Sequence, residues 1–110
     1  ALALIQKGMK TITSSSITTY TSINNDQVVV DTQANPVTIN LPATPSVGSE
    51  ITIMDGSASG GFATNAVTVG RNGSNINGSA SDYTLNINNQ CTTFIYANAT
   101  KGWLLKSTNQ

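Results

Sequence analysis

Residues 37–41, with the sequence VTINL, alternate without a fault between apolar and polar side chains, and this pattern constrains the fold more than any other stretch. A period of two among β-branched residues is typical of a strand with one buried face and one wet face. The run VVVDT at residues 28–32 predicts a second strand. Pro42 should end the alternating strand, because proline has no N–H to give to a ladder. The expected buried face consists of Val37, Ile39 and Leu41.

Similar short apolar patterns recur along the rest of the chain, separated by turn-forming residues. Their spacing is near the 8–12 residues expected of a sandwich or barrel. The sequence therefore predicts an all-β fold, a small antiparallel β-sandwich or prism-like module of about seven strands. Weak strands are expected within 11–22, and clearer strands at 49–55, 66–69, 83–87, 91–96 and 103–105.

The chain divides by composition at residue 23. Residues 1–23 are expected to form an N-terminal arm with weak strands, and residues 24–110 the β module. The apolar start, ALALI, cannot bury itself, so we expect it to pack on a neighbouring chain. The small first residue is compatible with a trimmed initiator methionine and a complete small protein, and a fragment of a longer protein is the alternative.

Two Asn-Gly pairs, Asn72-Gly73 and Asn77-Gly78, enclose a single apolar residue, Ile76. Asn-Gly supplies the positive φ angles of tight turns. One apolar residue between two corners resembles the edge of a β-solenoid or a β-prism. The segments PVTIN at 36–40 and AVTVG at 66–70 are also alike, but two short matches in a threonine-rich chain do not establish a duplication.

Charged residues make up only 9% of the chain, five acidic and five basic, against about 25% in an ordinary globular protein. Asn, Ser and Thr together exceed a third of the residues, a composition common in extracellular β-proteins and in viral fibres and shells. Scattered, balanced charge disfavours nucleic-acid binding and polybasic membrane contact. No apolar run approaches the ~20 residues of a membrane span, so membrane insertion is not expected.

Catalytic chemistry is not expected from this sequence. The chain has no histidine and a single cysteine, Cys91, which excludes histidine-dependent triads, thiolate zinc sites and an intrachain disulfide. Cys91 is expected to be a small buried apolar residue, and oligomerisation is the expected source of stability. Asp26, Asp31, Asp55 and Asp82 lie beside turns, where a side-chain cap is the usual role. We therefore expect no catalytic, cofactor-binding or metal-binding residues, although calcium held by scattered oxygens stays open.

The glycine-rich segment at residues 56–62 is the best candidate for an exposed contact loop. Tyr and Trp are the residues that favour stacking on sugars. Tyr96 and Trp103 lie in or beside apolar strands and are expected to fill the core, which leaves Tyr83 as the better exposed candidate. The predicted contact residues are Gly56, Ser57, Ser59, Gly60, Gly61, Phe62 and Tyr83.

The order of several segments resembles a module of bacteriophage virion proteins. The segments lie at residues 25–32, 36–42, 48–55, 65–69 and 72–80 and end on Gly102-Trp103. Such modules occur in tail-fibre, tailspike and related structural proteins, notably of phages of marine bacteria and cyanobacteria. The resemblance covers residues 24–105. It implies an all-β, usually trimeric, non-enzymatic component of the particle exterior, and it carries no defined receptor site.

Two roles compete within that class. A tail-fibre module would attach to host surface glycans through its loops, whereas a capsid cement (decoration) protein would staple major capsid subunits. Both roles imply a homotrimer that contacts other virion proteins. A bacterial extracellular carbohydrate-binding or adhesin domain, monomeric and with exposed aromatic residues, is the alternative from a different class, and a glycosidase ranks lowest because the acidic residues are dispersed.

Overall fold

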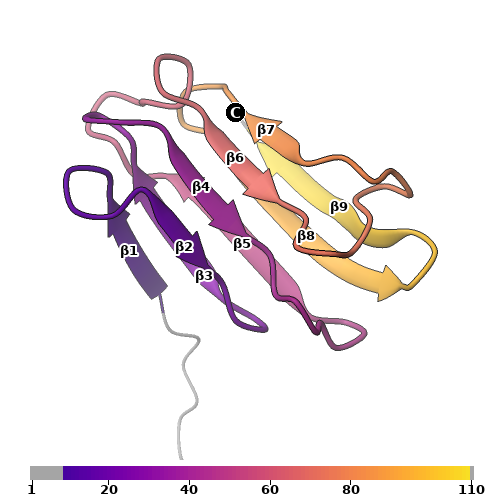
Figure 1. Ribbon diagram of the computed structural model, residues 1–110. Helices are drawn as coiled ribbons and strands as arrows, with labels where there is room; N and C mark the ends of the chain where they lie inside the picture. The colour runs from indigo at the N-terminus through magenta and orange to yellow at the C-terminus, as the bar shows by residue number, and fades with distance from the viewer. Residues whose placement is uncertain (1–8, 110) are drawn as a thin grey trace, which may run out of the picture.

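The computed structural model describes residues 9–109 and is all-β in that range (Figure 1). The expectations for residues 1–8 as an arm lie outside the described residues. No helix in the described range is long and apolar enough to cross a membrane. The strands are β1 (Met9–Thr13), β2 (Thr19–Thr21), β3 (Gln27–Asp31), β4 (Val37–Asn40), β5 (Glu50–Asp55), β6 (Val67–Gly70), β7 (Tyr83–Leu85), β8 (Cys91–Asn98) and β9 (Gly102–Asn109).

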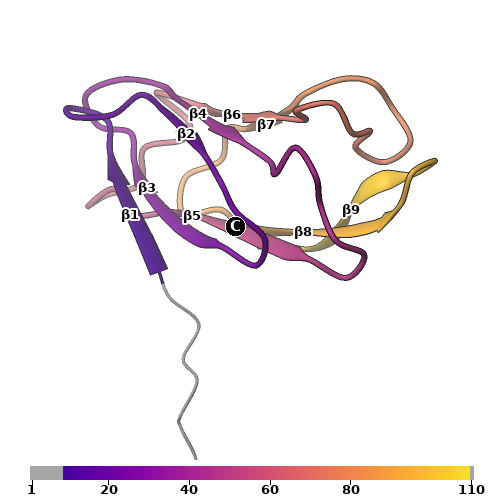
Figure 2. The same ribbon diagram turned by 60° about the horizontal axis from the view of Figure 1, so that its bottom comes forward.

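The strands form two facing sheets, and the chain alternates between them as far as β6. One sheet has the order β1-β3-β5-β8-β9 and the other β2-β4-β6-β7, seen as two layers in Figure 2. Each pair β1–β2, β3–β4 and β5–β6 therefore makes one coil of a short β-solenoid. We call these the first, second and third coils. The weak strands expected before residue 23 form the first coil and belong to the same two sheets as the rest.

Parallel pairing dominates the first half of the chain, which corrects the expectation of a purely antiparallel fold of about seven strands. β1, β3 and β5 pair in parallel, as do β2, β4 and β6. Antiparallel pairs appear only from β7 onward. The physical reason is that each connection carries the chain to the opposite sheet, so a strand meets its equivalent from the next coil running the same way.

The similar segments at 36–40 and 66–70 occupy equivalent places in successive coils. Val37 pairs with Val67, and Thr38 pairs with Thr68. The two segments are alike because they stack in register in the second and third coils, where equivalent positions face inward or outward in the same way.

The core lies between the sheets and contains the inward residues of both. Val37, Ile39 and Leu41 are at most 2% exposed, which confirms the predicted buried face, and β4 ends before Pro42. Trp103 is fully buried, as expected, with Tyr96 packed on it edge-to-face at 5.4 Å between ring centroids. Cys91, expected to be buried, is partly exposed, because it occupies the outward position at the start of β8.

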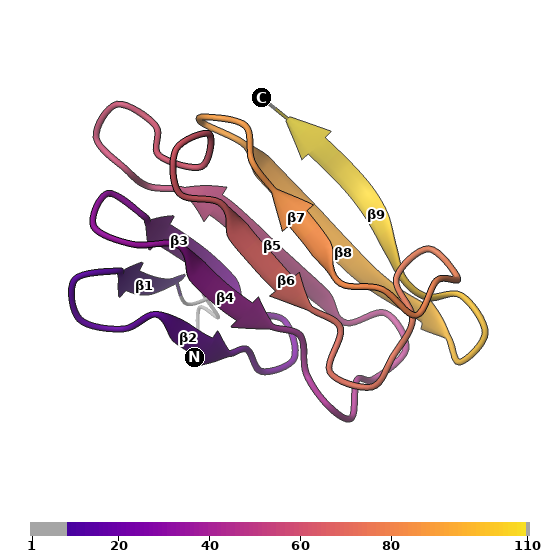
Figure 3. The ribbon, with the colours of Figure 1, turned by 45° about the horizontal axis from the view of Figure 1, so that its top comes forward.

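The two ends of the stack differ. At the end that we call the closed end, residues 75–78 cover the beginning of the outer edge of β9 (Figure 3). Trp103 N donates to Asn75 O at 2.8 Å, and Asn77 N donates to Trp103 O at 2.7 Å. Positive φ angles at both Asn-Gly pairs confirm the predicted tight turns of this segment. At the opposite end, which we call the open end, β1 and β2 have no outer strand partner among residues 9–109.

Candidate functional site

The loop between β5 and β6 is organised by the carboxylate of Asp55, the last residue of β5. Its Oδ2 accepts hydrogen bonds from the backbone N–H groups of Gly61 at 2.7 Å, Asn89 at 3.0 Å and Phe62 at 3.2 Å. Its Oδ1 accepts from Ser57 N at 3.0 Å. Burial would raise the pKa of this carboxyl, but the four backbone donors outweigh burial and lower the pKa below its ordinary value. The loop is therefore fixed by a charged acceptor at its base.

Only part of the predicted contact loop reaches the surface. Gly56 and Ser59 are exposed, whereas Ser57 and Gly61 are buried. Phe62, expected at an exposed tip, is fully buried in the core. The prediction for Phe62 as an exposed residue is wrong because Asp55 draws the backbone at this position inward through a hydrogen bond to Phe62 N.

Tyr83, the other predicted contact residue, packs on the core. It lies in β7, is partly buried, and meets Phe94 edge-to-face with 5.8 Å between ring centroids. Tyr20 and Tyr96 are also partly buried against the core, and every Phe and Trp of the chain is fully buried. Among residues 9–109, the aromatic rings that reach the surface are these three tyrosines, and each is only partly exposed.

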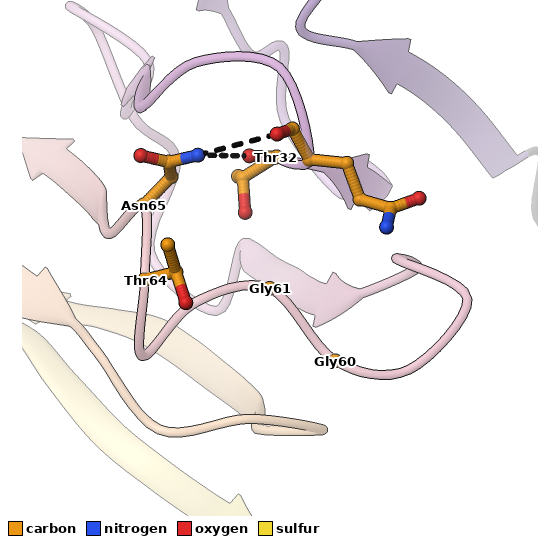
Figure 4. A pocket seen from close by; sticks show the side chains of 6 residues that line it. Thr32, Gly60, Gly61, Thr64 and Asn65 are labelled. Carbon is orange, nitrogen blue, oxygen red and sulfur yellow. Dashed lines mark hydrogen bonds between the residues drawn. The ribbon is translucent and has the colours of Figure 1, made fainter.

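A cavity of about 120 Å³ opens between this loop and the turn that follows β3. The two segments are adjacent because β3 and β5 pair in parallel, which brings the ends of both strands to the same edge of the sheet. Asn65 joins them by donating from Nδ2 to Thr32 O at 2.8 Å and to Gln33 O at 3.4 Å (Figure 4). The cavity is lined by Thr32, Gln33, Gly60, Gly61, Thr64 and Asn65.

The Thr32 hydroxyl is the unusual group of this cavity. Thr32 is fully buried, and its Oγ1 has no hydrogen-bond partner in the described part of the chain. Figure 4 shows its side chain directed toward the loop that carries Gly61 and Thr64. A Cβ at Gly61 would collide with Ser57 Oγ and would lie 2.7 Å from Thr32 Oγ1, so only glycine fits over these two hydroxyls.

All five carboxylates of the chain have partners within the described residues. Asp31 Oδ1 accepts from Gln33 N at 2.9 Å, which confirms its predicted role as a turn cap. Asp26 accepts from Ile23 N and from the Tyr20 hydroxyl. Asp82 accepts from Arg71 N, and Glu50 pairs with Lys106. Residues 9–109 contain no group of three or more potential metal-ligating side chains.

The cavity offers hydrogen bonds and no charged side chain. Its side chains are two hydroxyls and two amides, and its remaining surface is glycine backbone. Such groups hold and orient a neutral polar ligand. Sequence reasoning pointed to the glycines of this site but missed Thr32, Gln33, Thr64 and Asn65. A signal was present: Asp31 and Asp55 both follow apolar runs, as the ends of stacked strands would.

Comparisons with known proteins identify the fold and no family. No protein-family model and no curated protein matches the chain. Among solved structures, a chain from a structure described as that of a chaperone–substrate complex superimposes with a TM-score of 0.55 at 13% identity. The match covers 88% of this chain and 16% of that one, so the fold corresponds to a small part of a much longer protein there.

Proposed function

We propose that the chain is a non-enzymatic structural module on the exterior of a bacteriophage particle, of the tail-fibre or host-attachment type. The order of its segments resembles phage virion modules over residues 24–105. Its all-β stack of coils suits a module built in series into a longer fibre, and the matched solved chain holds such a fold within a far longer polypeptide.

The observation that carries this proposal is the use of the carboxylates. Each of the five accepts a hydrogen bond or ion pair that fixes a turn, a loop or a strand edge. A glycosidase needs two carboxyl groups flanking a shared cleft. Here, the cavity has no carboxylate side chain in its lining, and Asp55 is occupied by four backbone donors. The chain therefore uses its carboxylates to fix turns, loops and strand edges.

Assembly as a homotrimer is part of this proposal. β1 and β2 leave the N–H and C=O groups of two edges without a strand partner among residues 9–109. Unpaired edges are natural sites for pairing with another chain. The partners would be two further copies of the chain and other virion proteins. A host surface glycan would be the external ligand of the fibre role.

Capsid cement is the second candidate role, and one observation favours it. A glycan-binding surface gains much of its affinity from exposed Tyr or Trp, whereas the tyrosines of this chain are partly buried and its single Trp is fully buried. The same observation counts against a monomeric bacterial carbohydrate-binding or adhesin domain, which would depend on exposed aromatic residues.

The two virion roles separate in a binding experiment with purified protein. The fibre role predicts saturable binding to host cells and competition with phage adsorption, with no binding to tail-less capsids. Binding to capsids alone would replace the fibre role with cement. Binding to neither, together with absence of the chain from purified particles by mass spectrometry, would refute the proposal as a whole.

A further inference from the structure

We propose that the trimer is built head to tail, with the outer edges of β1 and β2 on one copy paired with the outer edges of β9 and β7 on the next copy. This inference rests on the homotrimer of the proposed function and adds the surface that receives the open end. Three observations carry it: the symmetry of a trimer, the places of the unpaired strand edges, and the directions and register of the strands that bear them.

Threefold symmetry requires two different surfaces at each contact. When an edge pairs with the same edge of a second copy, the contact is isologous, satisfies both partners at once and stops at a dimer. Three copies around one axis must each offer one surface to the preceding copy and another surface to the following copy. The outer edges of β1 and β2 therefore need a different edge as their partner in a trimer.

The other unpaired strand edges of the described chain lie together at the closed end. β7 and β9 are the last strands of their sheets, opposite β2 and β1 (Figure 3). Residues 75–78 cover β9 only around Trp103, so residues 105–109 have no outer strand partner in the described part of the chain. The lengths also match, because β1 and residues 105–109 each span five residues, and β2 and β7 each span three.

The strand directions allow both sheets to continue across such a contact. β8 is antiparallel to both β5 and β9, so β9 runs in the same direction as β5, β3 and β1. A copy that continues the stack in the same direction would therefore add its β1 to β9 as a parallel pair. β7 runs opposite to β2, β4 and β6, so the added β2 would form an antiparallel pair with β7.

The register of the four-stranded sheet brings two tyrosines to the contact. Tyr20 pairs with Ile39 in β4, and Tyr83 pairs with Val69 in β6. Ile39 and Val69 pair with each other, so the two tyrosines lie at opposite ends of one row of paired residues. Both pack partly buried on the core, at strands that have no outer neighbour. Extending the row across the contact places Tyr20 beside Tyr83 of the next copy, as a cross-strand aromatic pair that covers both rings.

The neighbouring row shows that both edges are accessible. Thr19 and Thr21 of β2 are exposed, as is Thr84 of β7. Thr18 O accepts from Thr38 N at 2.8 Å, so alternation along the strand directs the backbone groups of Thr19 to the outer side. The pairs recorded within the sheet place Thr19 and Thr84 at opposite ends of this row, and across the contact they would be directly opposite each other.

The experiment is disulfide cross-linking between full-length copies, with Cys91→Ser as the background so that the native thiol is removed. Thr19→Cys and Thr84→Cys are made in separate chains, one of them ¹⁵N-labelled, which are mixed, refolded from urea and treated with oxidised glutathione. Directly opposite residues of an antiparallel pair have Cα atoms about 4.5–5.5 Å apart, within the roughly 4.4–6.8 Å of a disulfide. We expect a covalent dimer that contains one chain of each kind, identified by mass spectrometry.

Thr38→Cys is the matched control, because Thr38 lies in the same row one strand further from the contact. Mixed with Thr84→Cys, it should give about fivefold less covalent dimer, since β2 lies between the two thiols. Thr19→Cys alone and Thr84→Cys alone should give as little. Efficient cross-linking of Thr19→Cys with itself would show an isologous contact and overturn the inference, as would equal yields from Thr19→Cys and Thr38→Cys.

Failure of this inference and failure of the proposed homotrimer can be told apart by combining cross-linking with light scattering. A trimer in which Thr19→Cys and Thr84→Cys do not cross-link refutes the head-to-tail contact and leaves the trimer. Cross-linking in particles that grow beyond three chains keeps the contact and refutes the closed trimer, because a head-to-tail contact that does not close continues as an open stack. A monomer without cross-links refutes both.

Discussion

The closed end and the open end of the molecule differ in how their unpaired strand edges are covered. At the closed end, residues 75–78 bond to the outer edge of β9, and Gly102 lies directly against the backbone of Asn75. At the open end, β1 and β2 expose their outer edges. Residues 75–78 therefore cover only the start of β9, around Trp103, whereas β7, like β1 and β2, has no outer strand partner among residues 9–109.

Polar side chains cover the core at the open end. Lys10 pairs with the buried Val28, so it holds an inward-facing position of its sheet, and its Nζ lies 5.5 Å from the ring centroid of Tyr20. The Tyr20 hydroxyl donates to Asp26 Oδ2 at 2.7 Å. Inward charges on edge strands restrict pairing with wrong partners. The chain therefore covers part of one edge with backbone and places a small polar cluster at the other end.

The largest expected effect comes from the closed end. Gly102 has φ +69°, and a Cβ there would collide with the backbone of Asn75. We expect Gly102→Ala to lower the free energy of unfolding by about 3 kcal/mol, because it combines backbone strain with overpacking. Urea denaturation measures the change. Gly73→Ala is the matched control, since Gly73 has φ +95° and open space around it, and it should cost about 1 kcal/mol. Equal costs would show that residues 75–78 do not close this end.

A smaller effect is expected from the Asp55 corner. Asp55→Asn removes a charged acceptor from four N–H groups and should cost about 2 kcal/mol. Asp31→Asn, in the preceding coil, removes a charged acceptor from the N–H of Gln33 and should cost about 0.5 kcal/mol. The pKa of Asp55 is lowered in the folded state, so its contribution is full above the unfolded value near pH 4 and is lost as pH falls below it. Thermal melts from pH 6 to pH 2.5 test this, and an unchanged acid slope in Asp55→Asn would contradict it.

The smallest effect is expected at the open end. Tyr20→Phe removes one hydrogen bond to Asp26 and should cost about 1 kcal/mol. The pKa of Tyr20 is raised to about 12 by burial of its hydroxyl, by the hydrogen bond to Asp26 and by the negative charge of Asp26. Because the pKa of Tyr20 is higher in the folded state than its unfolded value near 10, the protonated hydroxyl contributes fully to stability below about pH 10. This contribution is lost as the pH rises from about 10 to about 12. Denaturation at pH 8 and pH 11.5 measures the difference.

Tyr83→Phe is the control for that loss. Its ring also packs partly buried on the core, and it should change stability at pH 8 by less than about 0.5 kcal/mol. A Tyr20→Phe variant as stable as Tyr83→Phe would mean that the polar cluster of the open end contributes nothing to folding.

The strands and turns of the fold could be predicted from the sequence because they depend on local patterns. The alternation at Val37, Ile39 and Leu41 identifies a buried face, and Asn72-Gly73 identifies a tight turn, whatever the rest of the chain does. Strand direction could not be predicted in this way, since a period of two is the same in parallel and antiparallel sheets. Direction follows from connections that cross to the other sheet.

The candidate site shows the same limit. Its glycines were visible as a loop, but the burial of Phe62 depends on the hydrogen bond from Phe62 N to Asp55, a contact within the folded loop. Thr32 belongs to the cavity only because β3 and β5 pair in register. Residues brought together by coil stacking are distant in sequence, and a single sequence gives no measure of that register.

We propose above that the chain assembles into a homotrimer through the edges of β1 and β2. Light scattering coupled to size-exclusion chromatography tests it most directly on the wild-type chain. We expect a particle of three times the 11.4 kDa chain mass across a tenfold range of concentration. A stable species of 11.4 kDa at every concentration would contradict it.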